Sequence, residues 1–257
     1  MEELVLDIRK LTKIYGYHTE SEFEALHSID FKVYKGEFIC IMGPSGSGKS
    51  TFINNISTID FPTSGLVFIN GIEIRTMSSN EIGRFRYNNL GFIFQDFNLL
   101  DTHTLYENIA MPLALAKVNT NEIKQRIDDI THKMSINHLL KKYPYECSGG
   151  QRQRAAICRA LINNPKIIVA DEPTGNLDST NSTELLNILV KLNKEQGVTI
   201  IMVSHDPLIA SYSSRFVYIN DGNIEHILER KESSQEDYFQ KIVDINSAKS
   251  KSILKHV

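Results

Sequence analysis

The sequence predicts an α/β fold in which helices cover a parallel sheet, with a β-rich segment before it and a helical segment inserted into it. Phe38–Met42, Ile167–Ala170 and Thr199–Val203 are short apolar runs, each followed by a loop and a helical pattern. This alternation is typical of parallel strands that are buried on both faces. Short β-branched and aromatic runs occupy the first part of the chain, whereas residues 105–147 have the apolar spacing of helices.

The chain has 257 residues, of which 41% are hydrophobic and 23% charged, so it can bury a core without disulfides. Its 28 basic and 31 acidic side chains leave a net charge of −3, which argues against a broad surface for nucleic acid. No apolar run reaches the roughly 18 residues of a membrane span, and acids stand where a signal peptide carries bases. We therefore expect a soluble cytoplasmic chain whose cysteines, Cys40, Cys147 and Cys158, are free thiols.

The β-rich segment begins with Leu4–Ile8 and continues with Phe31–Val33 and Val67–Ile74. Residues 70 and 71, within the last run, are Asn-Gly, a strong signal for a two-residue hairpin turn. Residues 221 and 222 are Asp-Gly and separate two further apolar runs. The sequence therefore predicts hairpins near both ends of the fold.

Helical periodicity marks two later segments. One helix face is predicted from the spacing of Ile123, Ile127, Ile130 and Met134, with Thr120 or Asn121 as the N-cap. A second helix carries Leu185, Leu189 and Leu192 on one face, and Gly197 is placed to end it.

The chain after residue 229 is polar and mixed in charge, and its last nine residues include Lys249, Lys251 and Lys255. We expect a solvated, partly ordered tail. The alternative is that these lysines contact a partner or an anionic membrane surface.

Residues 43–50 match the phosphate-binding pattern G-x4-G-K-[ST]. Glycines allow the backbone to approach phosphate oxygens closely, and the N-terminus of the next helix adds positive potential. In this pattern Lys49 contacts the β- and γ-phosphates, and the Ser50 hydroxyl binds Mg²⁺. A strand before the motif and a helical segment, Thr51–Ile56, after it supply the structural context that the pattern requires.

Two further motifs concern the chemistry of a nucleotide. Asp171 and Glu172 end a buried strand, where Asp171 suits a magnesium site and Glu172 can accept a proton from an attacking water. Residues 148–151, Ser-Gly-Gly-Gln, open a helix and form a second anion cradle. Because one chain holds one nucleotide, the simplest use of the second cradle is on a nucleotide bound by another copy.

These motifs resemble, in their order along the chain, those of the ATP-binding cassette (ABC) ATPases. Residues 148–151 resemble the signature motif, and Asp171 with Glu172 resembles the Walker B motif and the catalytic glutamate. Four further positions match the family: the Q-loop glutamine, the switch histidine, the D-loop aspartate and the aromatic that stacks on adenine. These are Gln95, His205, Asp178 and Tyr15.

The resemblance covers residues 4 to about 228 and implies a P-loop NTPase core with an N-terminal antiparallel β subdomain. It further implies a helical subdomain at about 98–160, which carries the signature motif, and leaves residues 229–257 as a polar C-terminal tail. One departure stands in the signature motif, where Cys147 replaces the usual leucine. Cysteine is a small hydrophobe, so packing at this position can be preserved.

The resemblance also implies a head-to-tail homodimer that encloses two ATP molecules, with Mg²⁺. Glu172, His205 and Gln95 would be catalytic, and Ser50, Gln95 and Asp171 would lie around the metal. The expected nucleotide-binding residues of the same chain are Tyr15, Gly43, Pro44, Ser45, Gly46, Ser47, Gly48, Lys49, Ser50 and Thr51. Those expected to act across the dimer are Ser148, Gly149, Gly150, Gln151 and Asp178.

Three classes of function are consistent with a cassette: the ATPase subunit of a membrane transporter, a soluble repair or translation protein, and a regulatory nucleotide-binding module. A repair cassette would have a long coiled coil between Lys49 and Ser148, and a translation protein would carry two cassettes. The presence of Glu172 argues against a module without hydrolysis. The sequence therefore favours a transporter subunit, peripheral on the cytoplasmic face of the membrane and bound to a transmembrane permease.

Residues 59–65 and 94–100 resemble the macrolide-export, lipoprotein-release and cell-division group of transporters. Residues 97–101, together with Tyr238, Phe239 and Gln240 in the tail, are most similar to the bacitracin-type, antimicrobial-peptide resistance branch. In that branch a large permease pairs with two ATPase copies and often works beside a sensor kinase. Gln95–Asp101 is the expected socket for a cytoplasmic helix of the permease. ATPases of the lipoprotein-release, macrolide-export or cell-division complexes are the alternative.

Overall fold

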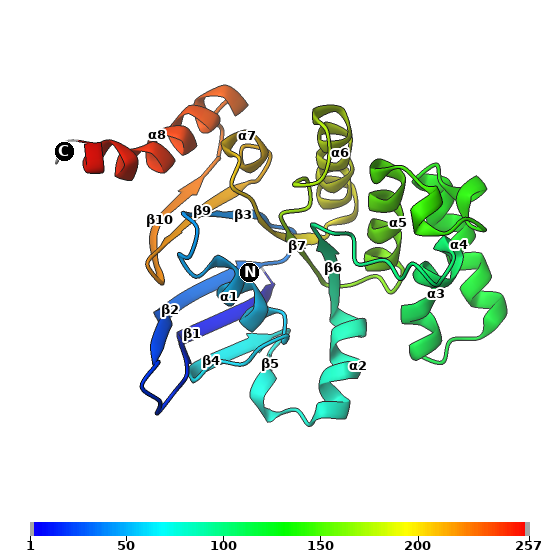
Figure 1. The fold of residues 1–257 in the computed structure, drawn as a ribbon, viewed down its shortest axis with the longest axis horizontal. Coiled ribbons are helices and arrows are strands. Elements are labelled where there is room, and N and C mark those ends of the chain that lie inside the picture. The colour runs from blue at the N-terminus through cyan, green and yellow to red at the C-terminus, as the bar shows by residue number, and fades with distance from the viewer. Residues whose placement is uncertain (1–2, 255–257) are drawn as a thin grey trace.

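The structure, a computed structural model, describes the backbone of residues 3–254 and the side chains up to residue 247. Within this range no helix is long and apolar enough to cross a membrane. Two sheets and their helices form one body, with the antiparallel sheet on one side and most helices on the other (Figure 1).

The N-terminal sheet is antiparallel, with strand order β2–β1–β4–β5. Its strands are β1 (Leu4–Tyr15), β2 (Phe23–Tyr34), β4 (Ser64–Ile69) and β5 (Ile72–Glu73). β1 and β2 are longer than the apolar runs that predict them, because register shifts and polar residues interrupt the period-2 pattern. The predicted turn at Asn70 and Gly71 is confirmed, since φ is positive at both residues (50° and 76°).

The second sheet has strand order β10–β9–β3–β8–β7–β6, with all neighbours parallel except β10 and β9. The strands are β3 (Phe38–Met42), β6 (Leu90–Phe94), β7 (Ile167–Asp171), β8 (Thr199–Val203), β9 (Arg215–Asn220) and β10 (Asn223–Glu229). The three predicted parallel strands and the hairpin at residues 221 and 222 are confirmed. The fold class predicted from the sequence is therefore correct.

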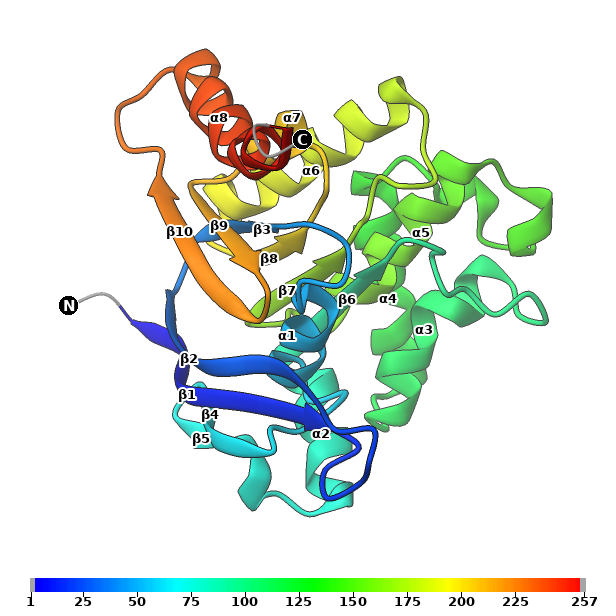
Figure 2. The same ribbon diagram turned by 60° about the vertical axis from the view of Figure 1, so that its left-hand side comes forward.

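Each face of the parallel sheet has its own core. Alternate residues of β3, β7 and β8 point to opposite faces, so Ile39 and Ile41 pack with the antiparallel sheet, whereas Cys40 and Met42 pack with the helices of the other face. Helix α1 (Lys49–Ile56) lies between the two sheets, as Figure 2 shows.

The other face is covered by α3 (Leu105–Leu115), α4 (Thr120–Lys133), α5 (Gly149–Leu161) and α6 (Ser179–Gln196). The predicted face of α4 is buried at Ile123 and Ile127, but its N-cap is Asn119, one residue before the predicted pair. Gly197 ends α6 with φ of 65°, as predicted. Short 3₁₀ turns occur at Ile74–Thr76, Asn137–Leu139 and Pro144–Glu146.

Two elements were not predicted from the sequence. Helix α2 (Ser79–Asn89) buries only Phe85, so its apolar periodicity is weak, and its capping box of Ser78 and Glu81 is its main signal. β6 contains Gly91, which weakens a strand pattern. A Cβ at Gly91 would lie 2.5 Å from the carbonyl oxygen of Ala160, so glycine allows α5 to pack directly on the strand.

The expectation of a solvated tail after residue 229 is wrong for its first half. Helix α8 spans Gln235–Leu254 and packs on the short helix α7 (Pro207–Ala210). Tyr238 and Ile242 are fully buried in the core, and Ile245 packs against it. Their helical spacing is present in the sequence, but the charged residues between them obscure it. The side chains of Lys249, Lys251 and Lys255 lie outside the described residues.

Candidate active site

The phosphate-binding pattern forms a loop between β3 and α1, at the carboxyl end of the parallel strands. Gly43 requires glycine because a Cβ there would lie 1.9 Å from the carbonyl oxygen of Ile219. Gly48 has φ of 101° and also lies against the backbone, at Ala25. No side chain caps the start of α1, so its first N–H groups are open to an anion.

Lys49 folds back over this loop. Its Nζ donates to the carbonyl oxygens of Gly43 at 3.0 Å and Pro44 at 2.7 Å. Burial lowers the pKa of Lys49, while the charges of Glu172 and Asp171 act in the opposite direction. Inside the loop the Ser47 hydroxyl is buried and finds no hydrogen-bond partner among the described residues. A loop with open N–H groups, a cation and an unpaired hydroxyl fits a phosphate group.

Ser50 is exposed and Thr51 is half-buried, both on the first turn of α1 beside Lys49. Ser45 and Gly46 form the exposed tip of the loop. The structure therefore gathers all the predicted loop residues around one concave backbone segment.

Asp171 and Glu172 stand at the carboxyl end of β7. Burial, and then the charge of Glu172, raises the pKa of Asp171, whereas Lys49 lowers it. Glu172 has a positive φ of 44° and its N–H donates to the carbonyl oxygen of Val203 at 3.1 Å. This backbone conformation is uncommon for a residue with a side chain and is typical of functional sites.

His205 meets Glu172 at the edge of the sheet. Its Nδ1 lies 3.2 Å from Oε2 of Glu172, although the two residues are 33 positions apart in the chain. The Glu172 side chain is 28% exposed and that of His205 is 71% exposed, so both can reach a substrate in solvent. The structure thus brings together two residues that only the resemblance connected.

Gln95 follows β6, and its side chain packs against Gly175 in the loop that precedes α6. A Cβ on Gly175 would lie 2.8 Å from Nε2 of Gln95. Asn176 joins the same two loops, since its Nδ2 donates to the Gln95 carbonyl oxygen at 3.2 Å and to Oδ1 of Asp96 at 2.7 Å. The position of Gln95 therefore depends on the loop at residues 175–178.

Replacing Gly175 with Ala is expected to displace the Gln95 side chain and lower kcat of ATP hydrolysis by about tenfold, or about 1.4 kcal/mol of barrier. The melting temperature should change little, because a flexible side chain can move aside. Gly83→Ala is the matched control, since Gly83 is helical and a Cβ there meets nothing within 4 Å. Equal kcat values for the two variants, measured by phosphate release, would contradict this placement of Gln95.

The signature-like turn begins α5. Ser148 Oγ accepts from the Gln151 N–H at 3.3 Å, and Gln151 Oε1 accepts from the Ser148 N–H at 3.0 Å. A Cβ on Gly150 would lie 2.2 Å from Oδ1 of Asn181, and the same asparagine bonds both oxygens of Asp178 at 2.8 Å. The turn at residues 148–151 and Asp178 therefore lie side by side.

The phosphate-binding loop and the signature-like turn lie on different faces of the parallel sheet. Helix α1 belongs to the core shared with the antiparallel sheet, whereas α5 belongs to the core of the helical face (Figures 1 and 2). The two anion cradles of one chain are therefore separated by the sheet.

Tyr15 ends β1 with its ring 41% exposed. Its hydroxyl donates to Oδ2 of Asp60 at 3.2 Å, and Nζ of Lys13 lies 5.0 Å from the ring centroid. Lys13 also donates to Oδ1 of Asp60 at 2.7 Å. These contacts hold an exposed aromatic ring in place at the edge of the antiparallel sheet.

Cys147 is largely buried in the helical core, 9% exposed, and burial raises the pKa of its thiol. Its side chain therefore packs as a small protonated hydrophobe, as the sequence predicts for a substitute of leucine.

Three residues that sequence reasoning missed hold the segment after Gln95. Phe97 and Asn98 both have positive φ, 61° and 48°. The buried guanidinium of Arg159 donates to their carbonyl oxygens at 2.8 and 2.5 Å, and Arg152 lies over the Phe97 ring. Asn108 bonds both backbone groups of Leu100. No sequence signal marks Arg159, because its partners lie more than 60 positions away.

Beside this segment lies an open apolar groove of about 440 Å³, between β6, α2, α3 and α5. The rings of Phe92 and Phe94 stack 5.7 Å apart, and Leu115 is 69% exposed. Its apolar lining is completed by Leu90, Met111, Pro112 and Ala160.

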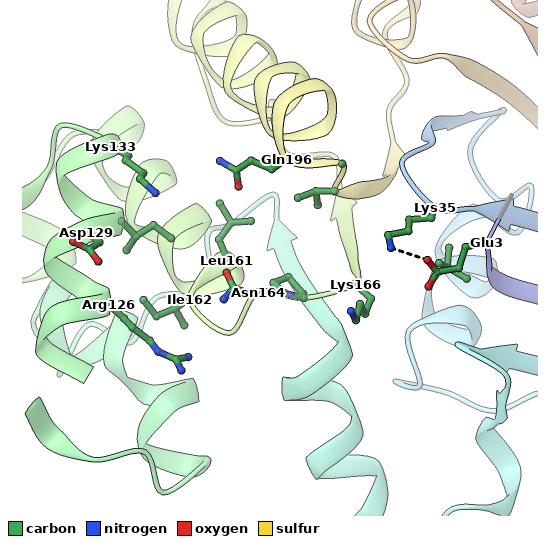
Figure 3. Close-up of a pocket in the computed structure, with 15 residues that line it drawn as sticks. Glu3, Lys35, Arg126, Asp129, Lys133, Leu161, Ile162, Asn164, Lys166 and Gln196 are labelled. Atoms are coloured by element: carbon green, nitrogen blue, oxygen red, sulfur yellow. Dashed lines mark hydrogen bonds and ion pairs between the residues drawn. The ribbon is translucent and has the colours of Figure 1, made fainter. Parts of the chain in front are cut away.

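A separate cavity of about 490 Å³ lies at the opposite ends of the parallel strands, next to the residues that precede β3, β7 and β8. Figure 3 shows Lys133, Arg126 and Asp129 from α4 on one side and the bonded pair of Lys35 and Glu3, 2.6 Å apart, on the other. It contains none of the predicted site residues and is not the nucleotide site.

A glycine-rich loop between strand and helix, with a lysine facing carboxylates at the end of a parallel strand, defines a P-loop nucleoside triphosphatase. Residues 26–175 match the family described as ABC transporter. The chain therefore belongs to the ABC transporter family and is the ATP-hydrolysing, nucleotide-binding subunit of a transporter.

The relatives agree. Over 241 residues the chain is 47% identical to the uncharacterized ABC transporter ATP-binding protein YvcR of Bacillus subtilis, covering 93% of each. It is 43% identical to the bacitracin export ATP-binding protein BceA of Halalkalibacterium halodurans, covering 93% of this chain and 94% of that protein. The dimeric cassette MJ0796, solved with ADP and Pi, has a TM-score of 0.80 and 37% identity, covering 87% of this chain and 98% of that one.

Proposed function

We propose that two copies of this chain dimerise head to tail and enclose two ATP molecules, each between the Lys49 loop of one copy and residues 148–151 of the other. The separation of the two cradles by the parallel sheet supports this, because one copy cannot apply both to one nucleotide. The dimeric cassette MJ0796, a relative at 37% identity, supports it as well.

In this proposal each copy contributes two sets of groups to the two sites. Its own loop, residues 43–51, holds the phosphates, and Tyr15 stacks on the adenine. Ser148, Gly149, Gly150, Gln151 and Asp178 contact the nucleotide of the other copy. The open N–H groups of α1 and the unpaired Ser47 hydroxyl are the features of the described chain that fit the phosphates.

Glu172 is the proposed general base that accepts a proton from the attacking water. His205 holds Glu172 in line and contacts the γ-phosphate; its 3.2 Å contact with Glu172 is the observation that carries this assignment. Ser50, Gln95 and Asp171 would hold Mg²⁺, which neutralises charge on the phosphates. The positions of Asp171 at the end of β7 and Gln95 after the adjacent β6 fit such a site.

We place the permease contact at the groove beside Gln95–Asp101. An apolar groove with an exposed leucine and two stacked phenylalanines fits the apolar face of a helix. The strained segment at Phe97 and Asn98 connects this groove directly to Gln95. The chain would then act as a peripheral subunit on the cytoplasmic face of the membrane.

Leu115→Glu is expected to weaken binding to the permease by at least about tenfold, since it places a charge in an apolar contact. Basal ATP hydrolysis of the isolated chain should be unchanged. Ile227→Glu is the matched control, because Ile227 is also exposed (52%) but lies on β10, at the other edge of the sheet. Co-purification of each variant with membrane fractions of the native host measures binding. Equal recovery of the two variants would exclude this groove.

The transported or displaced molecule is proposed to be an antimicrobial peptide of the bacitracin class, and a sensor kinase would join the complex through the permease. The 43% identity with BceA over nearly the whole chain supports this choice. The competing choice, macrolide export, is supported by the macrolide export ATP-binding/permease protein MacB of Syntrophobacter fumaroxidans, 42% identical over 221 residues. Lipoprotein release and cell division rest on the sequence motifs alone.

The same two variants test the choice in cells. A deletion strain should become several-fold more sensitive to bacitracin, and expression of the Ile227→Glu chain, but not the Leu115→Glu chain, should restore resistance. A deletion strain with unchanged sensitivity to bacitracin-like peptides and raised sensitivity to macrolides would favour the MacB-like alternative instead.

A further inference from the structure

The first turns of α8 are bound to the segment that carries His205. Tyr238 has no exposed surface, and its hydroxyl donates to the carbonyl oxygen of Leu228 at 3.2 Å. Burial raises the pKa of Tyr238 to about 12, so the side chain stays a neutral hydrogen-bond donor at physiological pH. Its hydroxyl also interacts with that of Ser213, which is itself fully buried.

Gln235 makes a second connection. Its Nε2 donates to Ser211 Oγ at 3.2 Å, and Ser211 Oγ donates to the carbonyl oxygen of Leu208 at 2.6 Å. Ser211 is the C-cap of α7 and is fully buried. The start of α8 therefore fixes the end of α7 by a polar contact in addition to the apolar packing of Tyr238 and Ile242.

Helix α7 is four residues long, so its two ends are only about 6 Å apart. Its N-cap is Asp206, which accepts from the Leu208 N–H at 2.8 Å and donates its own N–H to Ser204 Oγ at 3.1 Å. His205 stands between these two anchored residues. Since its side chain is 71% exposed, its position depends on the backbone on either side more than on packing around the ring.

We propose that α8 is a positioning element for the switch histidine, in which Tyr238 and Gln235 hold α7 so that His205 stays in contact with Glu172. This rests on the proposed role of His205 in hydrolysis. It gives a function to the segment after residue 229, which lies outside the cassette core and holds no nucleotide-binding motif. Figure 1 shows α8 extending from α7 away from the body, so movement of its outer part would reach α7 first.

The test uses Gln235→Ala and Tyr238→Phe, each of which removes one polar contact without opening a large cavity. Each should lower kcat of ATP hydrolysis about 3- to 10-fold, the equivalent of one hydrogen bond, and leave KM for ATP within about twofold. Lys241→Ala, an exposed position on the same helix, is the control and should keep the original kcat. Thermal melting of each variant verifies that it is folded.

The same changes are then made in a His205→Ala background, and single-turnover hydrolysis is measured with the enzyme in excess. If α8 acts through His205, neither Gln235→Ala nor Tyr238→Phe should lower the residual rate further. An equal further fall would show a merely structural role and overturn the proposal, as would unchanged kcat in both single variants. Full activity of His205→Ala alone would instead refute the role of His205 itself.

Discussion

Glu172→Gln is expected to lower the rate of ATP hydrolysis by about 10²- to 10⁴-fold, the contribution of a general base, or roughly 3–5 kcal/mol of barrier. Glutamine keeps the size of the side chain and can still face His205, but it cannot accept a proton from water. ATP binding should persist, and the head-to-tail dimer should accumulate because its ATP is not consumed.

Phosphate release and size-exclusion chromatography with ATP measure the two effects of this variant. Glu232→Gln, at an exposed position outside the site, is the control and should behave as the original chain. Hydrolysis at the original rate in Glu172→Gln would exclude Glu172 as the base. Loss of hydrolysis without an ATP-dependent dimer would refute the trans arrangement while leaving the base assignment intact.

Lys49→Ala has the second large expected effect and acts on a different step. Removing a charged donor from the phosphate loop should weaken ATP binding by about 10- to 100-fold, corresponding to a lost charge-assisted hydrogen bond. Dimerisation with ATP should be lost as a consequence. Titration with a fluorescent ATP analogue measures the affinity.

Lys35→Ala is the matched control, because Lys35 lies at the opposite ends of the strands and pairs with Glu3. Its affinity for the analogue should be unchanged. An unchanged affinity in Lys49→Ala would show that the observed position of Lys49, on the carbonyl oxygens of Gly43 and Pro44, is not one from which it reaches a phosphate.

The motifs near the nucleotide could be predicted from the sequence because each is local. The loop at residues 43–50 requires glycine where a Cβ meets backbone, and such a requirement is visible in a run of eight residues. Likewise, the buried strands β3, β7 and β8 are continuous apolar runs. Element identity was therefore predictable wherever one short segment carries the whole signal.

Contacts between distant segments could not be predicted in this way. Arg159 stabilises the segment at Phe97 and Asn98 through backbone carbonyl oxygens, which leave no trace in residue types. Gly91 appears to weaken a strand until its contact with Ala160 is known. In α8, only two or three buried positions per twenty residues face the core, so the charged majority predicted a solvated tail.

The placement of the two anion cradles on opposite faces of one sheet has a genetic consequence. If each copy supplies half of two sites, a defect in one copy is shared by both sites of any dimer it joins. A damaged allele of this gene would then be dominant over the intact one, and a host that carries both would fall below half of the normal activity. Such a subunit is a suitable target for a decoy copy that binds but does not turn over.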